Sequence, residues 1–272
     1  MRVKKSNHSK SASPRFWFSI LLVGILYVGS HWFYTRNYEV PILMYHQVEP
    51  RADESALNVR PDYFERQMAL LKKMNRQIIP LETLVQKIKN NEPIPYGTVA
   101  ITFDDGEANN YEYAYPILEK YQMPATFFVI TDNIDEPGWL TKKQLIEMDQ
   151  SIMDIGSHTV THAFLPKLDP SQILREVTQS KEALESILQR PVTLFSYPAG
   201  GVHYASLKAV EEAGYLGAVT TNHAPGIHQP YLLHRIKIKE SSANPVNLWF
   251  KTSGFYHLGK SRIPLDKPTL SE

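Results

Sequence analysis

The stretch AITFDDGEANN, residues 100–110, sets an apolar run directly against two adjacent carboxylates, Asp104 and Asp105, and then a glycine. An apolar run that ends in a turn signal predicts a buried strand, here Thr98 to Phe103. Two like charges side by side at the end of such a strand repel each other and need a partner. Taken alone, DDG is typical of a turn with solvated carboxylates, so the rest of the chain must decide between the two interpretations.

The residues on either side of this strand alternate between strand and helix patterns. Before it come a short apolar strand over 40–45 and two amphipathic segments that predict helices, 62–75 and 81–91. After it, helical patterns at 111–121, 141–150, 170–188 and 204–214 alternate with apolar strands at 125–130, 153–158, 192–198 and 216–221. Repeated strand-helix units predict an α/β fold with a parallel sheet or barrel. We expect an irregular tail from about Asn244.

The composition favours one large domain without a strongly charged partner. The chain has 272 residues, and its net charge of +1 provides no field that attracts nucleic acid. It contains no cysteine, which excludes disulfides and thiol catalysis.

The N-terminal region has the pattern of a membrane anchor. A basic leader over 1–15 precedes an uncharged stretch over 16–35, whose 20 residues span roughly 30 Å as a helix. Aromatic residues lie near both ends of this stretch, and the basic leader is expected on the cytoplasmic side. We therefore expect a single-pass protein of the cell membrane with an extracytoplasmic domain over 36–272. A signal peptide cleaved near VGS, residues 28–30, is the alternative.

A second cluster of functional residue types is SHTVTH, in which His158 and His162 lie four residues apart. A single turn of helix would point both imidazoles the same way. Because strand ends of parallel α/β folds converge on one face, these histidines should meet Asp104 and Asp105. Two imidazoles and one carboxylate suit Zn²⁺, while the second carboxylate stays free as a base. A metal would thus relieve the repulsion at the strand end.

A third candidate is FSYPAGG, residues 195–201, in which another predicted strand ends in a turn. Such a turn can present a backbone N–H, here that of Ala199, to a developing oxyanion. Tyr197 and Pro198 of the same turn are expected to contact the substrate. An ordinary turn after a strand is the alternative interpretation of this segment.

TFDDG, SHTVTH and FSYPAGG, in this order, resemble the first three motifs of the NodB-type polysaccharide deacetylases, carbohydrate esterase family 4. The resemblance covers residues 98–240 approximately and implies an incomplete, distorted (β/α) barrel, the NodB homology domain. The segment PILMYHQV, before the first motif, is similar to the opening of the poly-N-acetylglucosamine deacetylases of the IcaB and PgaB type.

The resemblance also implies a role for each site residue. Asp104 corresponds to the general base. Asp105, His158 and His162 correspond to the ligands of a divalent metal, with Zn²⁺ as the default and Co²⁺ or Ni²⁺ as alternatives. His46 corresponds to the general acid, which other members of the family carry near the C-terminus.

Some positions depart from the family pattern. Ser196 stands where many members carry an arginine that holds the base, and Ala199 stands where they carry an aromatic residue. Arg235 is a candidate replacement for that arginine, although we favour a surface salt bridge for it. His234, near the end of the late strand LLHRIKI, is the alternative general acid. No fourth motif of the DxxDW type is found after Gly214.

These features predict a metal-dependent hydrolase that removes acetyl groups from N-acetylglucosamine units of an extracellular polysaccharide. Poly-β-1,6-N-acetylglucosamine of biofilms is the expected substrate, with exopolysaccharide synthesis or export machinery as a candidate partner. Peptidoglycan is the alternative substrate. A membrane-tethered glycan-binding module without catalysis is the alternative of another class. A glycosidase is disfavoured because adjacent carboxylates do not flank a bond at the required separation of about 5 Å or more.

Overall fold

The computed structural model describes residues 17–18, 21–26, 28–29, 38–50, 57–221 and 229–258. The chain divides into two compact units, residues 1–38 and 39–272. In the first unit the described residues before Tyr38 are helical and exposed. No helix among the described residues is both long and apolar enough to cross a membrane, so the helix expected over 16–35 finds no support there. The leader expected over 1–15 lies outside the described residues, as do residues 16, 19–20, 27 and 30–35 of the expected anchor.

Seven parallel strands of the second unit form a closed ring. The order around the ring is β1, β8, β7, β6, β5, β4, β3, and a direct pairing of β1 with β3 closes it. The strands are β1 (Ile42–Tyr45), β3 (Thr98–Phe103), β4 (Thr126–Val129), β5 (Asp154–Ser157), β6 (Leu194–Ser196), β7 (Gly217–Thr220) and β8 (Leu233–Lys237). A short strand, β2 (Gln77–Ile78), pairs with the start of β3. The expected barrel is confirmed, with one strand fewer than the eight of a complete (β/α) barrel.

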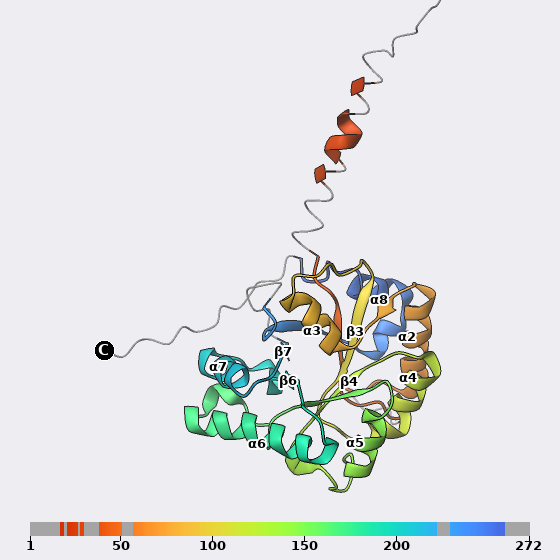
Figure 1. Cartoon of the computed structure of the whole chain (residues 1–272). Helices are drawn as coiled ribbons and strands as arrows, with labels where there is room; N and C mark the ends of the chain where they lie inside the picture. Colours follow the sequence, from red (N-terminus) through yellow and green to blue (C-terminus); the bar gives the residue numbers. More distant parts are fainter. Residues whose placement is uncertain are drawn as a thin grey trace, which may run out of the picture. The chain divides into compact units, whose positions relative to one another are not determined.

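Helices surround the strands of the ring (Figure 1). They are α2 (Pro61–Lys73), α4 (Tyr115–Tyr121), α5 (Lys142–Asp149), α6 (Pro170–Leu188), α7 (Tyr204–Glu212) and α8 (Pro245–Lys251). Their buried side chains share one apolar cluster with outward-facing strand residues such as Leu43, Ile101 and Phe127. The outer layer is thus held by the burial of one apolar stripe from each helix.

Helix α3 (Leu81–Lys89) fills the amino-terminal end of the barrel instead of covering its side. Leu81, Leu84 and Val85 share a buried cluster with the inward-facing strand residues Ile42, Ala100, Phe128, Leu194, Val219 and Leu233. A Cβ added to Gly217, the first residue of β7, would lie 2.8 Å from the side chain of Val85, so the helix packs tightly there. This apolar filling leaves the carboxyl end of the barrel for polar side chains.

The predicted elements agree best with the structure where the sequence signal is local. The strand Thr98–Phe103 and the helix Pro170–Leu188 have the expected bounds. The helix begins at a capping box, in which the Asp169 side chain accepts hydrogen bonds from the N–H groups of Ser171 and Gln172. The first residue of a helix with a capping box can therefore be predicted from the sequence.

Two expectations need correction. The helix expected over 111–121 consists of a π-helical turn, Asn110–Ala114, followed by α4. The expectation of an irregular tail from Asn244 is wrong for its first part, because the Asn244 side chain caps α8 by accepting hydrogen bonds from two backbone N–H groups. Residues 259–272 of that tail lie outside the described residues. Asparagine followed by Pro245 is a helix start signal, since asparagine caps and proline fits the first helical position.

Candidate active site

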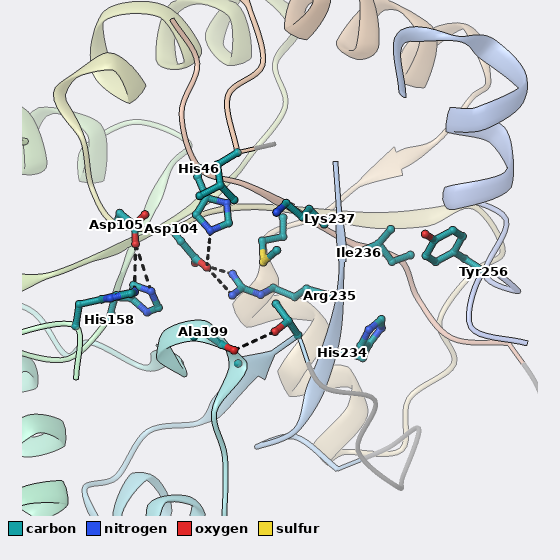
Figure 2. Close-up of a pocket in the computed structure, with 15 residues that line it drawn as sticks. His46, Asp104, Asp105, His158, Ala199, His234, Arg235, Ile236, Lys237 and Tyr256 are labelled. Carbon is teal, nitrogen blue, oxygen red and sulfur yellow. Dashed lines mark hydrogen bonds and ion pairs between the residues drawn. The ribbon is translucent and has the colours of Figure 1, made fainter. Parts of the chain in front are cut away.

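A cavity of about 510 Å³ opens at the carboxyl end of the barrel (Figure 2). Residues from all three sequence motifs line it, together with residues of β1 and β8. They include His46, Asp104, Asp105, His158, His162, Ala199, Arg235 and Lys237. The convergence of strand ends expected from the sequence is therefore observed for Asp104, for Asp105 with His158 and His162, and for His46.

Asp104 is held by Arg235 in a buried, two-pronged ion pair. Arg235 Nη1 and Nη2 donate to Asp104 Oδ1 and Oδ2, each at 2.6 Å, and the two residues are 2% and 3% exposed. Arg235 Nη2 also donates to Ser196 Oγ at 2.9 Å, and that hydroxyl donates to Asp104 Oδ1 at 3.3 Å. The interpretation of Arg235 as a surface salt bridge is wrong. Arg235 reaches Asp104 from strand β8, while the position of the family's arginine in the FSYPAGG motif is taken by Ser196.

This environment keeps Asp104 ionised. Burial alone would raise the pKa of the Asp104 carboxyl, but the Arg235 guanidinium and its hydrogen bonds hold that pKa well below its usual range. A carboxylate that is ionised throughout the physiological range has free lone pairs with which to accept a proton or orient a water molecule.

His46 lies next to Asp104 because their strands are neighbours. Tyr45 pairs with Phe103 in the β1–β3 ladder, and the Asp104 N–H donates to the Tyr45 carbonyl at 3.0 Å. His46 Nε2 consequently lies 4.0 Å from Asp104 Oδ2. Burial lowers the pKa of His46 below its usual value; the Asp104 charge opposes this, while Arg235 and Lys237 lower it further.

A polar network fixes the backbone that carries His46, and its residues were not singled out from the sequence. Asn110 Nδ2 donates to the His46 carbonyl at 2.8 Å, and Asn109 Oδ1 accepts from the Val48 N–H at 3.2 Å. Glu107 accepts from Gln47 Nε2 and from Asn109 Nδ2, both at 2.7 Å. The residues GEANN that follow the two aspartates thus tie the β1 loop to the end of β3, and a π-helical turn at this point is typical of functional sites.

Asp105, His158 and His162 form a cluster suited to a divalent metal. His158 Nε2 and His162 Nε2 each lie 3.6 Å from Asp105 Oδ1, and the three ligand atoms lie within 4.8 Å of one another. A tetrahedral zinc site with bonds of about 2.0–2.1 Å separates its ligand atoms by about 3.4 Å, so the residues fit such an ion. Asp105 Oδ1 is buried without a hydrogen-bond partner, as suits an oxygen that binds a cation.

The electrostatics of this cluster agree with metal binding. Burial and the neighbouring Asp104 and Glu107 charges raise the pKa of Asp105 to about 7. Burial lowers the pKa of His158 to about 4, so its ring is neutral at neutral pH. His158 Nδ1 lies 2.8 Å from the Ser196 carbonyl, to which it donates, and this leaves the Nε2 lone pair facing Asp105.

The helical turn that would point the two histidines the same way is not observed. Both lie in the loop that follows β5, where Thr159 and His162 have left-handed φ angles of 70° and 60°. A helix would require negative φ at each position. The four-residue spacing brings the rings to a centroid distance of 4.9 Å through this loop geometry instead.

The FSYPAGG turn contributes backbone, while two of its side chains point elsewhere. Ala199 lines the cavity with a left-handed φ of 51°. Tyr197 is 0% exposed and packs edge to face on Phe195 in the apolar cluster, and Pro198 is buried, so neither lies among the described residues that line the cavity. The expectation that Tyr197 and Pro198 contact substrate is therefore corrected.

His234 is a poor alternative acid because of strand alternation. Successive residues of a strand point to opposite faces, and Arg235 of β8 faces Asp104. His234 also lines the cavity, but it lies on the strand face shared with Ile236, whose side chain joins the outer apolar cluster. Figure 2 shows His234 apart from the Asp104 carboxylate, whereas His46 lies beside that carboxylate. The geometry favours His46.

Comparisons with known proteins agree with this fold and site. The family model for polysaccharide deacetylases matches residues 91–218. YxkH of Bacillus subtilis (strain 168), classed with the polysaccharide deacetylases, is 36% identical over 203 residues, 74% of this chain and 71% of that protein. The poly-beta-1,6-N-acetyl-D-glucosamine N-deacetylase of Staphylococcus epidermidis is 30% identical over 171 residues, but the match spans only 58% of this chain and 59% of that enzyme.

Solved structures show the same likeness. The Streptococcus pyogenes deacetylase PplD, solved with acetate, is 32% identical with a TM-score of 0.74, and the match covers 79% of this chain and 98% of PplD. IcaB from Ammonifex degensii has a TM-score of 0.70 at 22% identity, covering 79% and 97%, which shows the common fold. With its three motifs gathered in one pocket and relatives matched over most of their length, the chain belongs to the polysaccharide deacetylase family of hydrolases.

Proposed function

We propose that the protein is a metal-dependent N-deacetylase acting on N-acetylglucosamine units, with poly-β-1,6-N-acetylglucosamine as its first candidate substrate. The observation that carries the proposal is the Asp104 carboxylate, paired with Arg235 and 4.0 Å from His46 Nε2, beside the Asp105, His158 and His162 cluster. The Staphylococcus epidermidis relative, a poly-beta-1,6-N-acetyl-D-glucosamine N-deacetylase, supports this choice of substrate.

The cluster would hold the metal through Asp105 and the Nε2 atoms of the two histidines. When bound, a divalent ion polarises a carbonyl group and lowers the pKa of water. Zn²⁺ is the default for this donor set, and Co²⁺ or Ni²⁺ also accept imidazole and carboxylate ligands. The hydrogen bond from His158 Nδ1 to the Ser196 carbonyl fixes the tautomer that leaves Nε2 free to bind the metal.

The remaining chemistry uses the chain's own residues. Asp104 takes a proton from the attacking water as its oxygen bonds to the acetamide carbon. The Ala199 N–H, at the left-handed turn, stabilises the oxyanion that develops on the carbonyl oxygen. Protonated His46 gives its proton to the amide nitrogen as the C–N bond breaks, and acetate and a glucosamine unit leave.

A glycan-binding module without catalysis is the competing proposal. Sugar binding does not require a buried carboxylate held ionised by an arginine next to a separate set of metal ligands. Perturbed ionisable groups gathered in a cavity favour an active site, because such arrangements cost stability and serve chemistry. The enzyme is therefore the better proposal.

We also propose that the stretch 16–35 tethers the domain to the cell membrane, with the domain on the outer side. The uncharged length and its basic leader support this placement. An outward-facing enzyme reaches an exported glycan or its export machinery. Protease accessibility of the domain in intact cells tests the proposal.

The decisive experiment measures acetate release by the full-length protein in detergent. β-1,6-linked N-acetylglucosamine oligomers are offered with added Zn²⁺ and, in parallel, with a chelator. We expect release that the chelator abolishes and that zinc restores. Release only from peptidoglycan fragments would move the substrate to the β-1,4-linked alternative, and no release from metal-loaded protein with either glycan would favour the binding module.

A further inference from the structure

The loop that carries both histidine ligands is held in a conformation that its own sequence does not favour. Thr159 and His162 both have left-handed φ angles, of 70° and 60°. Such a conformation costs a non-glycine residue roughly 1–2 kcal/mol. Some contact outside the loop must therefore hold it in place, and the spacing of the two Nε2 atoms depends on that contact.

Glu176, in the middle of helix α6, makes this contact. Its Oε2 accepts hydrogen bonds from the N–H groups of Val160 at 2.9 Å and Thr161 at 3.0 Å. Its Oε1 accepts from Thr161 Oγ1 at 2.8 Å. Successive backbone N–H groups that point to one side form a concave anion site, and here the anion is a side chain of the protein itself.

The opposite edge of the loop is also fixed. The N–H groups of Thr131 and Asp132, in the turn after β4, donate to the carbonyls of Thr159 and Val160 at 3.2 and 3.0 Å. The loop therefore has its N–H groups bound on one side and its carbonyls on the other. The contact to the N–H groups depends on a single side chain, that of Glu176, so one substitution can remove it.

We propose that Glu176 is a positioning residue for the metal centre: it fixes the loop between His158 and His162 and thereby sets the distance between the two imidazole ligands. This rests on the proposed metal-dependent function. Glu176 binds no metal and touches no substrate in this arrangement. Its removal frees the Val160 and Thr161 amides, and the strained residues on either side can then relax to negative φ.

The test measures zinc affinity without using catalysis. Full-length wild type, Glu176→Gln and Glu176→Ala are stripped of metal and titrated with Zn²⁺ in competition with a chelating dye. Loss of a partner outside the ligand sphere typically weakens metal binding by about 10–100-fold, which we expect for Glu176→Ala. Glu176→Gln should lose less, because its one carbonyl oxygen can still accept from both amides. Glu182→Ala, at an exposed position of the same helix, is the matched control and should bind like wild type.

Two further readouts separate positioning from folding. The Co²⁺ absorption spectrum reports the ligand geometry and should change in Glu176→Ala, while circular dichroism of the metal-free protein should not. Thr161→Val removes one of the three hydrogen bonds and should also weaken zinc binding. This variant tests the inference if Glu176→Ala does not fold. Wild-type affinity in a folded Glu176→Ala, or in Thr161→Val where the alanine variant does not fold, overturns the inference. Absence of zinc binding by wild type would instead refute the proposed metal dependence itself.

Discussion

Arg235, in strand β8, meets Asp104, at the end of strand β3, through two parallel hydrogen bonds of 2.6 Å. Removing one partner of a buried ion pair leaves an uncompensated charge and costs about 3–5 kcal/mol. We therefore expect Arg235→Met to lower the free energy of unfolding by that amount and to abolish activity. Asp104→Asn with Arg235→Met should recover much of the stability and none of the activity. Urea denaturation checks this, and a double variant as unstable as the single one would contradict it.

The assignment of base and acid predicts a pattern among three variants. Asp104→Asn and His46→Ala should each lower kcat by about 10²–10⁴, the usual contribution of a general acid or base. Both should retain zinc, since neither residue belongs to the ligand cluster. His234→Ala should retain most of the activity, because strand alternation turns it away from Asp104. An active His46→Ala beside an inactive His234→Ala would reverse the assignment of the acid.

The alkaline limb of the pH profile should respond to Lys237. Burial and the charges of Arg235 and Lys237 lower the pKa of His46, and the acid works only while it is protonated. Removing a positive neighbour favours the protonated ring and raises its pKa, so Lys237→Met should move the fall of kcat/KM to higher pH. Lys239→Met, at an exposed position nearby, is the control. The measurement is kcat/KM against pH at constant ionic strength and saturating metal; a limb that stays in place or moves down argues against His46 as the acid.

The turn next to the predicted oxyanion donor should tolerate no side chain at Gly200. Gly200 has a φ of +69°, and an added Cβ would lie 1.9 Å from Thr221 Oγ1 and 2.8 Å from the Thr221 nitrogen. Gly214 has a similar φ of +79° but open space around it. Gly214→Ala should thus cost only the backbone strain, about 1–2 kcal/mol, whereas Gly200→Ala should cost more and also lower kcat. Unfolding curves and rates of the two variants make the comparison, and equal losses of stability would show that the clash is relieved.

The sequence predicted most of the local elements and the three motifs. The bounds of β3 and α6 follow from an apolar run and a capping box, which are signals contained in neighbouring residues. The grouping of Asp105 with His158 and His162 follows from the rule that parallel strands end on one face. The bounds of the elements are thus set within short segments, while the grouping of the three residues needs only the general rule for parallel folds.

The remaining features depend on pairings between distant segments. Nothing in LLHRIKI says which side of the strand Arg235 occupies until its register against β1 is known. The four-residue spacing of His158 and His162 suits a helical turn equally well, and the choice of loop was decided by contacts with Glu176 and with the turn after β4. The Asn109 and Asn110 contacts to the β1 loop are likewise invisible without the β1–β3 pairing.

The closure of the ring by β1 has a consequence for the order in which the enzyme becomes competent. A ribosome makes β1, with His46 behind it, first among the strands of the ring, and makes β8, with Arg235, last. Until β8 is made, β1 lacks one of its two neighbours, and Asp104 lacks the cation that keeps its buried carboxylate charged. A chain that ends before β8 therefore contains His46 and Asp104 but lacks the arginine that pairs with Asp104. The site is complete only when β8, the last strand to be made, pairs with β1, the first.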